Sequence, residues 1–305
     1  MLKKTMWLLL AAALPFTLVT GTDALQAQSK LSAAAVIEKN VAARGGLQAW
    51  RNVQTLTMSG TMGAGGNQRA TLNTTPPVQS SHKGLQAAMP TRPVDEVRLP
   101  ITIYLARTRK MRVELAFKGD TAVQVFDGTN GWKLRPYLNR RVVEPFTDAE
   151  LKTSMSQTDL DGPLVDYAAK GSKVELAGME KVEGHDNYKV KITLKNGESK
   201  NVWIDAQTFL ETKIEGTPRR LDGTDHPVEV YYRDYRNVSG LQIPFTIETR
   251  VLPVAKTMMG LRDTPVPPEK MIFDKIAVNP KLETSLFTKP EVLQSSVSKP
   301  GPVAK

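Results

Sequence analysis

Along most of the chain, apolar and polar residues alternate with a period of two, which indicates β-strands with one buried face. The clearest run extends from Tyr188 to Lys195, where every second residue is apolar. Asn196-Gly197 follows it and is a strong hairpin signal, because both residues tolerate the positive φ of a tight turn. A further hairpin is expected over residues 121–135, where Asp127-Gly128-Thr129-Asn130-Gly131 separates two alternating runs. These hairpins predict an antiparallel sheet.

Three helices are expected among the strands. The first covers residues 29–44 and ends at Gly45-Gly46, since glycine is common after a helix C-terminus. Thr147 begins a capping box that predicts a helix to residue 157. The third is expected over residues 161–171, where an Asp-Gly-Pro start and a Lys-Gly end are typical helix boundaries. The last two form a helical pair in the middle of the strands.

About ten strands in sequential hairpins, with few helices, predict a mainly β (α+β) fold. A sheet of this size tends to curl. Its apolar face needs a cover, and the N-terminal helix and the helical pair are available for it.

The first 27 residues have the three parts of a secretory signal peptide: two lysines, a short apolar run and small residues near Ala24 and Ala27. We expect cleavage after Ala27, which makes the mature protein exported and periplasmic. Residues 28–290 are predicted to form one domain with insertions at 63–100 and 253–270, where Gly and Pro interrupt the pattern. Residues 291–305 are expected to be a disordered tail.

The chain has no cysteine. This excludes a lipid anchor on a mature N-terminal Cys, a thiol nucleophile, disulfide bonds and Cys-based metal sites. The three histidines, His82, His185 and His226, lie far apart in the sequence, and no HExxH, GxSxG, P-loop or GxGxxG motif is present. We therefore expect no enzyme activity, no catalytic residues, no metal and no cofactor. A spatial cluster of His185, His226 and acidic residues would favour the opposite.

The formal charge of the chain is +10, and removing Lys3, Lys4 and Asp23 with the signal peptide leaves +9. A basic balance suits an anionic partner, such as an anionic membrane surface or an acidic protein of the cell envelope. Export makes nucleic acid an unsuitable partner, and a basic but unpartnered surface explains the charge equally well. The turn Arg107-Thr108-Arg109-Lys110 is interpreted as a solvated turn or, alternatively, as a contact for lipid head groups.

Five short stretches follow one another along the chain: Gly45-Gly46 with Trp50, Phe126-Asp127-Gly128 with Trp132 and Pro136, Trp203-Ile204-Asp205 with Thr208, Asp234-Tyr235 with Gly240-Leu241 and Pro244, and Asn279-Pro280 with Leu286-Phe287 and Pro290. In this order they resemble the LolA/LolB-like superfamily, and especially the outer-membrane lipoprotein-sorting proteins. The resemblance covers most of residues 30–290. The chain departs from a compact carrier through its two insertions, and no arginine is matched to the one that holds the family's lid.

The resemblance implies an unclosed antiparallel β-barrel around a lid of short helices, and a periplasmic carrier that binds acyl chains of lipids or lipoproteins in an apolar cavity. The alternative is a non-catalytic envelope sensor or docking module with the same fold, whose interior is filled. The expected lipid-binding residues lie on predicted strands and on the lid: Val123, Val125, Trp132, Leu134, Leu164, Tyr167, Val190, Ile192, Leu194 and Trp203.

Overall fold

The computed structural model describes residues 31–64, 97–136, 140–221, 223–254 and 266–291. All elements named below belong to one compact unit, Ala33–Lys305. The predicted signal peptide, the predicted tail beyond residue 291 and most of both insertions lie outside the described residues, so these boundaries stay predictions.

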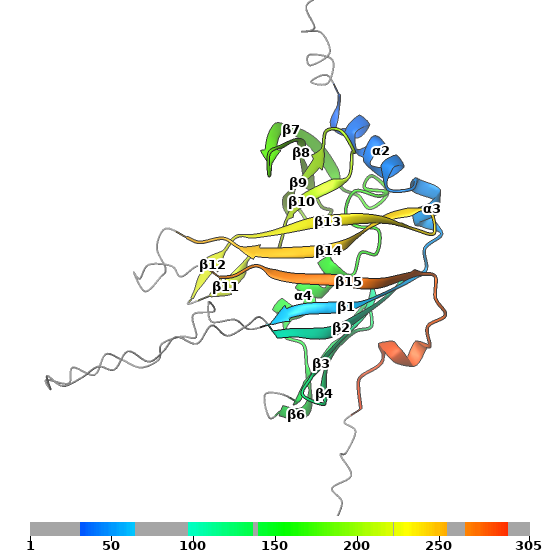
Figure 1. Cartoon of the computed structure of the whole chain (residues 1–305), viewed down its shortest axis with the longest axis vertical. Coiled ribbons are helices and arrows are strands. Elements are labelled where there is room, and N and C mark those ends of the chain that lie inside the picture. Colours follow the sequence, from blue (N-terminus) through cyan, green and yellow to red (C-terminus); the bar gives the residue numbers. More distant parts are fainter. Residues whose placement is uncertain (1–30, 65–96, 137–139, 222, 255–265, 292–305) are drawn as a thin grey trace, which may run out of the picture. The chain divides into compact units, whose positions relative to one another are not determined.

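One antiparallel sheet of thirteen strands dominates the described residues, in the order β6-β5-β4-β3-β2-β1-β15-β14-β13-β10-β9-β8-β7 (Figure 1). Its strands are β1 (Thr55–Ala64), β2 (Val97–Ala106), β3 (Lys110–Phe117), β4 (Asp120–Phe126), β5 (Gly131–Arg135), β6 (Arg140–Pro145), β7 (Lys173–Val182), β8 (His185–Thr193), β9 (Ser199–Asp205), β10 (Glu211–Glu215), β13 (Val228–Val238), β14 (Leu241–Val251) and β15 (Glu269–Val278). A separate short hairpin joins β11 (Arg219–Leu221) to β12 (Thr224–His226).

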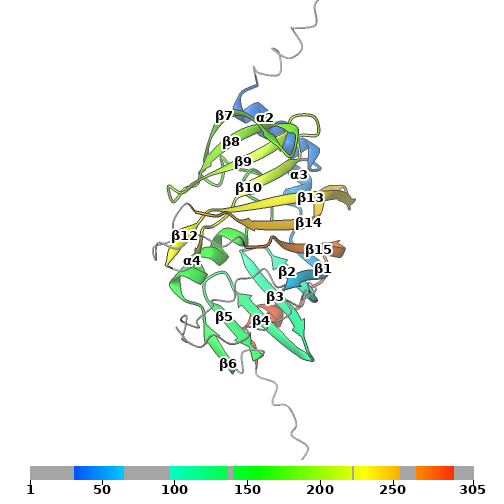
Figure 2. The same ribbon diagram turned by 60° about the vertical axis from the view of Figure 1, so that its left-hand side comes forward.

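The sheet curls but does not close, because β6 and β7 remain as its two edges (Figure 2). Only one segment of the chain connects these edges, residues 146–172, and it carries α4 (Asp148–Gln157) followed by a series of turns. The expected mainly β, unclosed antiparallel architecture is therefore confirmed.

The sheet has more strands than the alternation predicts, chiefly because β7 was not recognised. Most of its residues are exposed on both sides, as its position at the sheet edge allows. In its sequence, KVELAGMEKV, the period-two alternation covers only residues 173–176. It ends where the register with β8 shifts between Leu176 and Gly178.

The expected N-terminal helix is present as α2 (Ala33–Ala43), followed by the short α3 (Leu47–Arg51). Gly45 and Gly46 separate them with φ angles of 112° and 92°, which side chains rarely adopt. The predicted capping box is also present: the Thr147 hydroxyl accepts a hydrogen bond from the Glu150 amide, and the Glu150 carboxylate accepts one from the Thr147 amide.

The helix expected over residues 161–171 is wrong, because the chain forms turns there. Gly162 and Asp166 have φ angles of 78° and 53°, and two left-handed residues four positions apart interrupt an α-helix. The Asp-Gly-Pro sequence starts a turn, in which the Gly162 amide donates to the Asp159 carbonyl. The connecting segment therefore contains one helix instead of two.

The main core lies between the sheet and this connecting segment. Leu160 and Val165 of the segment join Trp50 of α3 in one cluster of buried residues with strand side chains such as Met58 and Phe273. We call residues 146–172 the lid, and the side of the sheet that carries this cluster the lid face. The lid thus contributes to the hydrophobic core, as the sequence predicts for a cover of the apolar face.

Candidate functional site

The strand register shows which residues share the lid face, because directly opposite residues of antiparallel strands point to the same side. Met58 lies opposite Ile103, and Ile103 lies opposite Val113. The next two pairings bring Gln124 opposite Val113 and Lys133 opposite Gln124. The lid face therefore continues from the core to β5, next to the edge strand β6.

A small cavity of about 130 Å³ opens on this part of the lid face. It is lined by Met62, Ile101, Val113, Leu115, Ala122, Gln124 and Arg135, and we call it the lid-face cavity. Its wall is apolar apart from the amide of Gln124 and the guanidinium of Arg135. Small-molecule pockets typically measure about 300–1,000 Å³, so the lid-face cavity admits only the end of a larger ligand while the lid is in place.

The lid is attached to the rest of the protein by charged groups. Asp161, whose side chain is 5% exposed, lies 2.7 Å from the Arg107 guanidinium. Arg107 also donates to the carbonyl oxygens of Val53 and Trp50, each at 2.7 Å. Arginine is suited to such multiple contacts because its guanidinium carries five N–H donors. Arg107 thus holds the lid against α3 and the start of β1, and is not the freely solvated turn residue that its neighbours suggest.

Two further ion pairs hold the ends of the lid. Arg51 binds Asp166 with two hydrogen bonds of 2.7 Å, and these bonds lower the pKa of the Asp166 carboxyl. At the other end, Lys133 on the lid face contacts Glu150 of α4 at 2.5 Å. Both pairs include an exposed partner, so each contributes only about 0–1 kcal/mol to the attachment.

Arg44 connects the lid to the far half of the sheet. It lies at the end of α2, and its Nη1 donates to the Asp161 carbonyl at 3.0 Å and to Glu211 of β10 at 3.2 Å. Its guanidinium carbon lies 4.3 Å from the centroid of the Trp50 ring. The buried Arg44 therefore holds the backbone of residue 161, while Arg107 holds its side chain.

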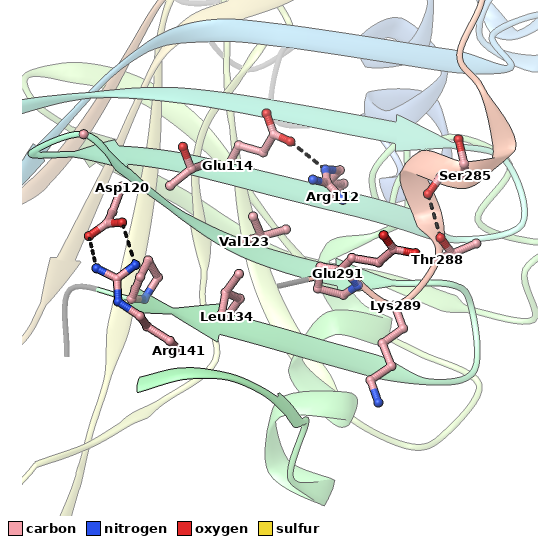
Figure 3. Close-up of a pocket in the computed structure, with 14 residues that line it drawn as sticks. Arg112, Glu114, Asp120, Val123, Leu134, Arg141, Ser285, Thr288, Lys289 and Glu291 are labelled. Atoms are coloured by element: carbon pink, nitrogen blue, oxygen red, sulfur yellow. Dashed lines mark hydrogen bonds and ion pairs between the residues drawn. The ribbon is translucent and has the colours of Figure 1, made fainter. Parts of the chain in front are cut away.

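A larger cavity of about 700 Å³ lies on the opposite face of the sheet (Figure 3). Val123 and Leu134 form its apolar floor, and the pairs Arg112–Glu114 and Arg141–Asp120 lie beside them. Residues 285–291 form the other wall, next to the short helix η2 (Thr284–Phe287). The Arg112 guanidinium donates to the Leu286 carbonyl at 3.3 Å, which ties this C-terminal segment to the sheet.

The structure divides the expected lipid-binding residues between the two faces. Val190 lies opposite Val202, and the pairing continues through Ile214 and Val230 to Thr249, which shares its side with Ile247 of the core cluster. Ile192 and Leu194 alternate with Val190 and share its face. Leu164 of the lid is completely buried, and Tyr167 is half-buried.

The other expected residues point away from the lid. Val125 lies opposite Trp132, and Val123 lies opposite Leu134, on the side of the larger cavity. Trp203 is also on this side, where Lys213 lies 3.9 Å from the centroid of its ring. The period of a strand separates its two faces but does not say which one is covered, so the sequence left this choice open.

Sequence reasoning missed the charged residues of the lid. Asp161 was interpreted as part of a helix start, although it pairs with Arg107, 54 positions earlier in the chain. Arg135 continues the alternation of β5 and carried no signal of its own. Arg135 could be identified only once the covered face of β5 was known, because a charged residue on a covered face is unusual and points to a function.

Of the three histidines, the structure describes His185 and His226, which lie on β8 and β12. His226 is buried on β12, and its Nδ1 lies 3.2 Å from the Leu252 carbonyl, whereas His185 is exposed at the start of β8. Within the described ranges, no three His, Cys, Asp or Glu side chains are grouped as metal ligands. No helix in the part of the chain that the structure describes is long and apolar enough to span a membrane.

No family model matches the chain. No curated protein matches it either. Among solved structures, a LolA superfamily protein from Nitrosomonas europaea is 13% identical, with a TM-score of 0.49, over 85% of this chain and 98% of that one. A DUF1329 family protein from Desulfovibrio piger is 10% identical, with a TM-score of 0.48, over 84% of this chain and 97% of that one.

A third solved structure, an outer membrane lipoprotein-sorting protein domain from Vibrio parahaemolyticus, is 12% identical, with a TM-score of 0.46, over 84% of this chain and 96% of that one. Two of these three proteins carry names from the group that the sequence resembles. Identities and TM-scores this low say nothing of ligand or activity. Function therefore has to be argued from the residues of this chain.

Proposed function

We propose that this protein binds the acyl chain of a lipid or lipoprotein on the lid face of its sheet and carries it through the periplasm. The observation that supports this most is the combination of an apolar lid face with a lid attached by charged groups. Ion pairs exchange readily with water, whereas strand pairing does not. A segment held in this way can leave the apolar face without unfolding the sheet.

The free energies are compatible with ligand uptake by displacement of the lid. Leu160, Leu164 and Val165 are buried lid side chains, and exposing each of them costs about 1.5–3 kcal/mol. An acyl chain that occupies the same face regains roughly 0.8 kcal/mol per buried CH₂. A chain of about ten methylenes therefore offsets the loss of the lid contacts.

We place the acyl chain along the line from the lid-face cavity to the core cluster, past Val113, Ile103 and Met58. Val190, Ile192 and Leu194 belong to the same face, and we propose them as its continuation toward β8. Leu164 and Tyr167 belong to the lid, and we propose that they cover the bound chain. Val123, Val125, Trp132, Leu134 and Trp203 lie on the opposite face, and their contact with a ligand stays a prediction from the sequence.

The test is mass spectrometry of organic extracts from protein isolated from a periplasm, together with uptake of a pyrene-labelled phospholipid from vesicles. Val113→Glu introduces a charge into the half-buried wall of the lid-face cavity and is expected to abolish uptake. Val142→Glu is the matched control, because Val142 on the edge strand β6 is 62% exposed.

A bound lipid in the wild-type extract, lost in Val113→Glu but kept in Val142→Glu, supports the carrier. A protein that is free of lipid and takes up none from vesicles overturns the proposal. The remaining interpretation is then the envelope docking module, with the lid as a permanent part of its core.

A further inference from the structure

We propose that the acyl ligand ends in an anionic group, a carboxylate or a phosphate, and that Arg135 binds this group in the lid-face cavity. The inference rests on the proposed function and narrows its class of ligand. It distinguishes an acyl chain with a charged end from an acyl chain whose ester or amide groups are neutral.

The position of Arg135 is the first argument. It lines the lid-face cavity beside five apolar side chains. It also pairs with Glu144, which lies directly opposite Lys133 on the lid face. A charged group among apolar neighbours is unfavourable unless its donors are satisfied. Glu144 satisfies part of this need, and an acceptor oxygen that enters the cavity would satisfy the rest.

The hydrogen bonds of Arg135 are the second argument. Its Nη2 donates to Glu144 of β6 at 3.0 Å. Its Nε is buried and has no hydrogen-bond partner among the residues that the structure describes. Buried N–H donors are almost always paired in folded proteins. An oxygen of a bound ligand is the partner that this donor lacks.

The shape of the guanidinium decides the class of ligand. Its planar fork matches the two oxygens of a carboxylate or phosphate, and its five donors allow it to bind Glu144 and a second anion together. The amide of Gln124 lines the same cavity and offers two more N–H donors. The cavity has the volume of about four water molecules, which suits an anionic head with the first carbons of its chain.

Two charged residues near Arg135, Lys133 and Glu144, affect how strongly it can bind an anion. Lys133 is paired with Glu150 of the lid, so it does not neutralise the ligand while the lid is in place. Glu144 is 30% exposed and competes with the ligand for Arg135. Removal of the Glu144 charge is therefore expected to strengthen the binding of an anion, whereas removal of the Arg135 charge weakens it.

The experiment compares three probes of equal chain length, decanoate, decyl phosphate and decanol, by calorimetric titration of lipid-free protein. Arg135→Gln is expected to weaken both anionic probes by about 10- to 100-fold, the effect of one charged hydrogen-bonding partner. Decanol binding is expected to change by less than about 2-fold, because an alcohol does not use the charge. The ratio of decanoate to decyl phosphate affinity in the wild type identifies the preferred anion.

Two variants serve as controls. Arg141→Gln removes a neighbouring arginine that pairs with Asp120 on the opposite face, and is expected to leave all three affinities unchanged. Glu144→Gln is expected to raise the affinity for both anions, which keeps the proposal testable if Arg135→Gln does not fold.

Equal binding of the three probes by the wild type, or anion binding unaffected by both Arg135→Gln and Glu144→Gln, overturns the role of Arg135 and leaves acyl-chain binding intact. Absence of binding for every probe overturns the proposed function as well. The two failures are therefore distinguishable.

Discussion

Arg107 and Asp161 form the contact that attaches the middle of the lid to the sheet, with 2.7 Å between the guanidinium and the carboxylate. The two residues are not equivalent. Arg107 also binds two backbone carbonyls. The Asp161 carboxylate is almost completely buried, and within the described ranges its other ion pair is with Lys170, at 3.9 Å. Loss of the arginine therefore leaves a buried carboxylate nearly unpaired.

We expect Arg107→Gln to lower the free energy of unfolding by about 2–4 kcal/mol, because a buried charge without its partner is strongly unfavourable. Asp161→Asn is expected to cost less, since Arg107 keeps its two carbonyl contacts. Urea denaturation of both variants measures the difference. Equal costs, or a larger cost for Asp161→Asn, contradict this account of the contact.

Arg51 and Asp166 form an exposed pair at the end of the lid, and this pair is expected to control lid opening more than stability. Arg51→Gln removes both of its hydrogen bonds to Asp166. We expect faster amide hydrogen exchange in residues 158–171 and faster lipid uptake, with little change in the melting temperature. High salt should have the same effect on the wild type, because it screens exposed charges. Unchanged exchange in both experiments would show that the pair does not hold the lid.

Glu183 is expected to make the stability of the folded state depend on pH in the acidic range. Hydrogen bonds from Arg233, followed by attraction to Arg233 and the contacts of Arg250, lower the pKa of Glu183 to about 2, against the opposing effect of burial. A lowered pKa means that the folded state favours the carboxylate. The stabilisation is therefore complete above the unfolded pKa of 4.5 and is lost as the pH falls toward 2.

We expect Glu183→Gln to lower the melting temperature at pH 7, with a difference from the wild type that shrinks below about pH 4.5 and disappears near pH 2. Thermal melts across this pH range measure it. Glu175→Gln is the matched control, an exposed glutamate on the same hairpin, and should show no such trend. A difference that persists unchanged at pH 2 would assign the effect to packing.

At Gly60 the backbone of β1 lies too close to that of β15 to leave room for a side chain. The register between the two strands shifts between Ser59 and Gly60, and a Cβ on Gly60 would lie 2.6 Å from the Phe273 Cα and also collide with the Ile272 carbonyl oxygen. Gly60→Ala is expected to destabilise the protein by about 1–3 kcal/mol, because the backbone of β15 has to move. Denaturation in urea tests this, with Ser59→Ala as the neighbouring control. A neutral Gly60→Ala would mean that the bulge adapts freely.

Much of the strand pattern followed from the sequence alone, because alternation and turn chemistry are local properties. The runs around Tyr188 and Trp132 and the turn at Asn196-Gly197 each contain their own signal. The capping box at Thr147 is equally local, since its two hydrogen bonds join residues three positions apart. The edge strand β7 escaped prediction because its alternation covers only residues 173–176, ends at the register shift beside Gly178, and is followed mostly by exposed side chains.

Tertiary structure decided which face of each strand meets the lid, and with it the candidate site. The sequence predicts Val123 as a lining residue, yet its neighbour Ala122 is the one that lines the lid-face cavity. The roles of Arg107, Asp161 and Arg135 depend on partners that are distant in the chain or on a cavity that several strands build together. Alternation defines the two faces of a strand, but only long-range packing determines which face is covered. The reason is that the covering segment, the lid, lies elsewhere in the sequence.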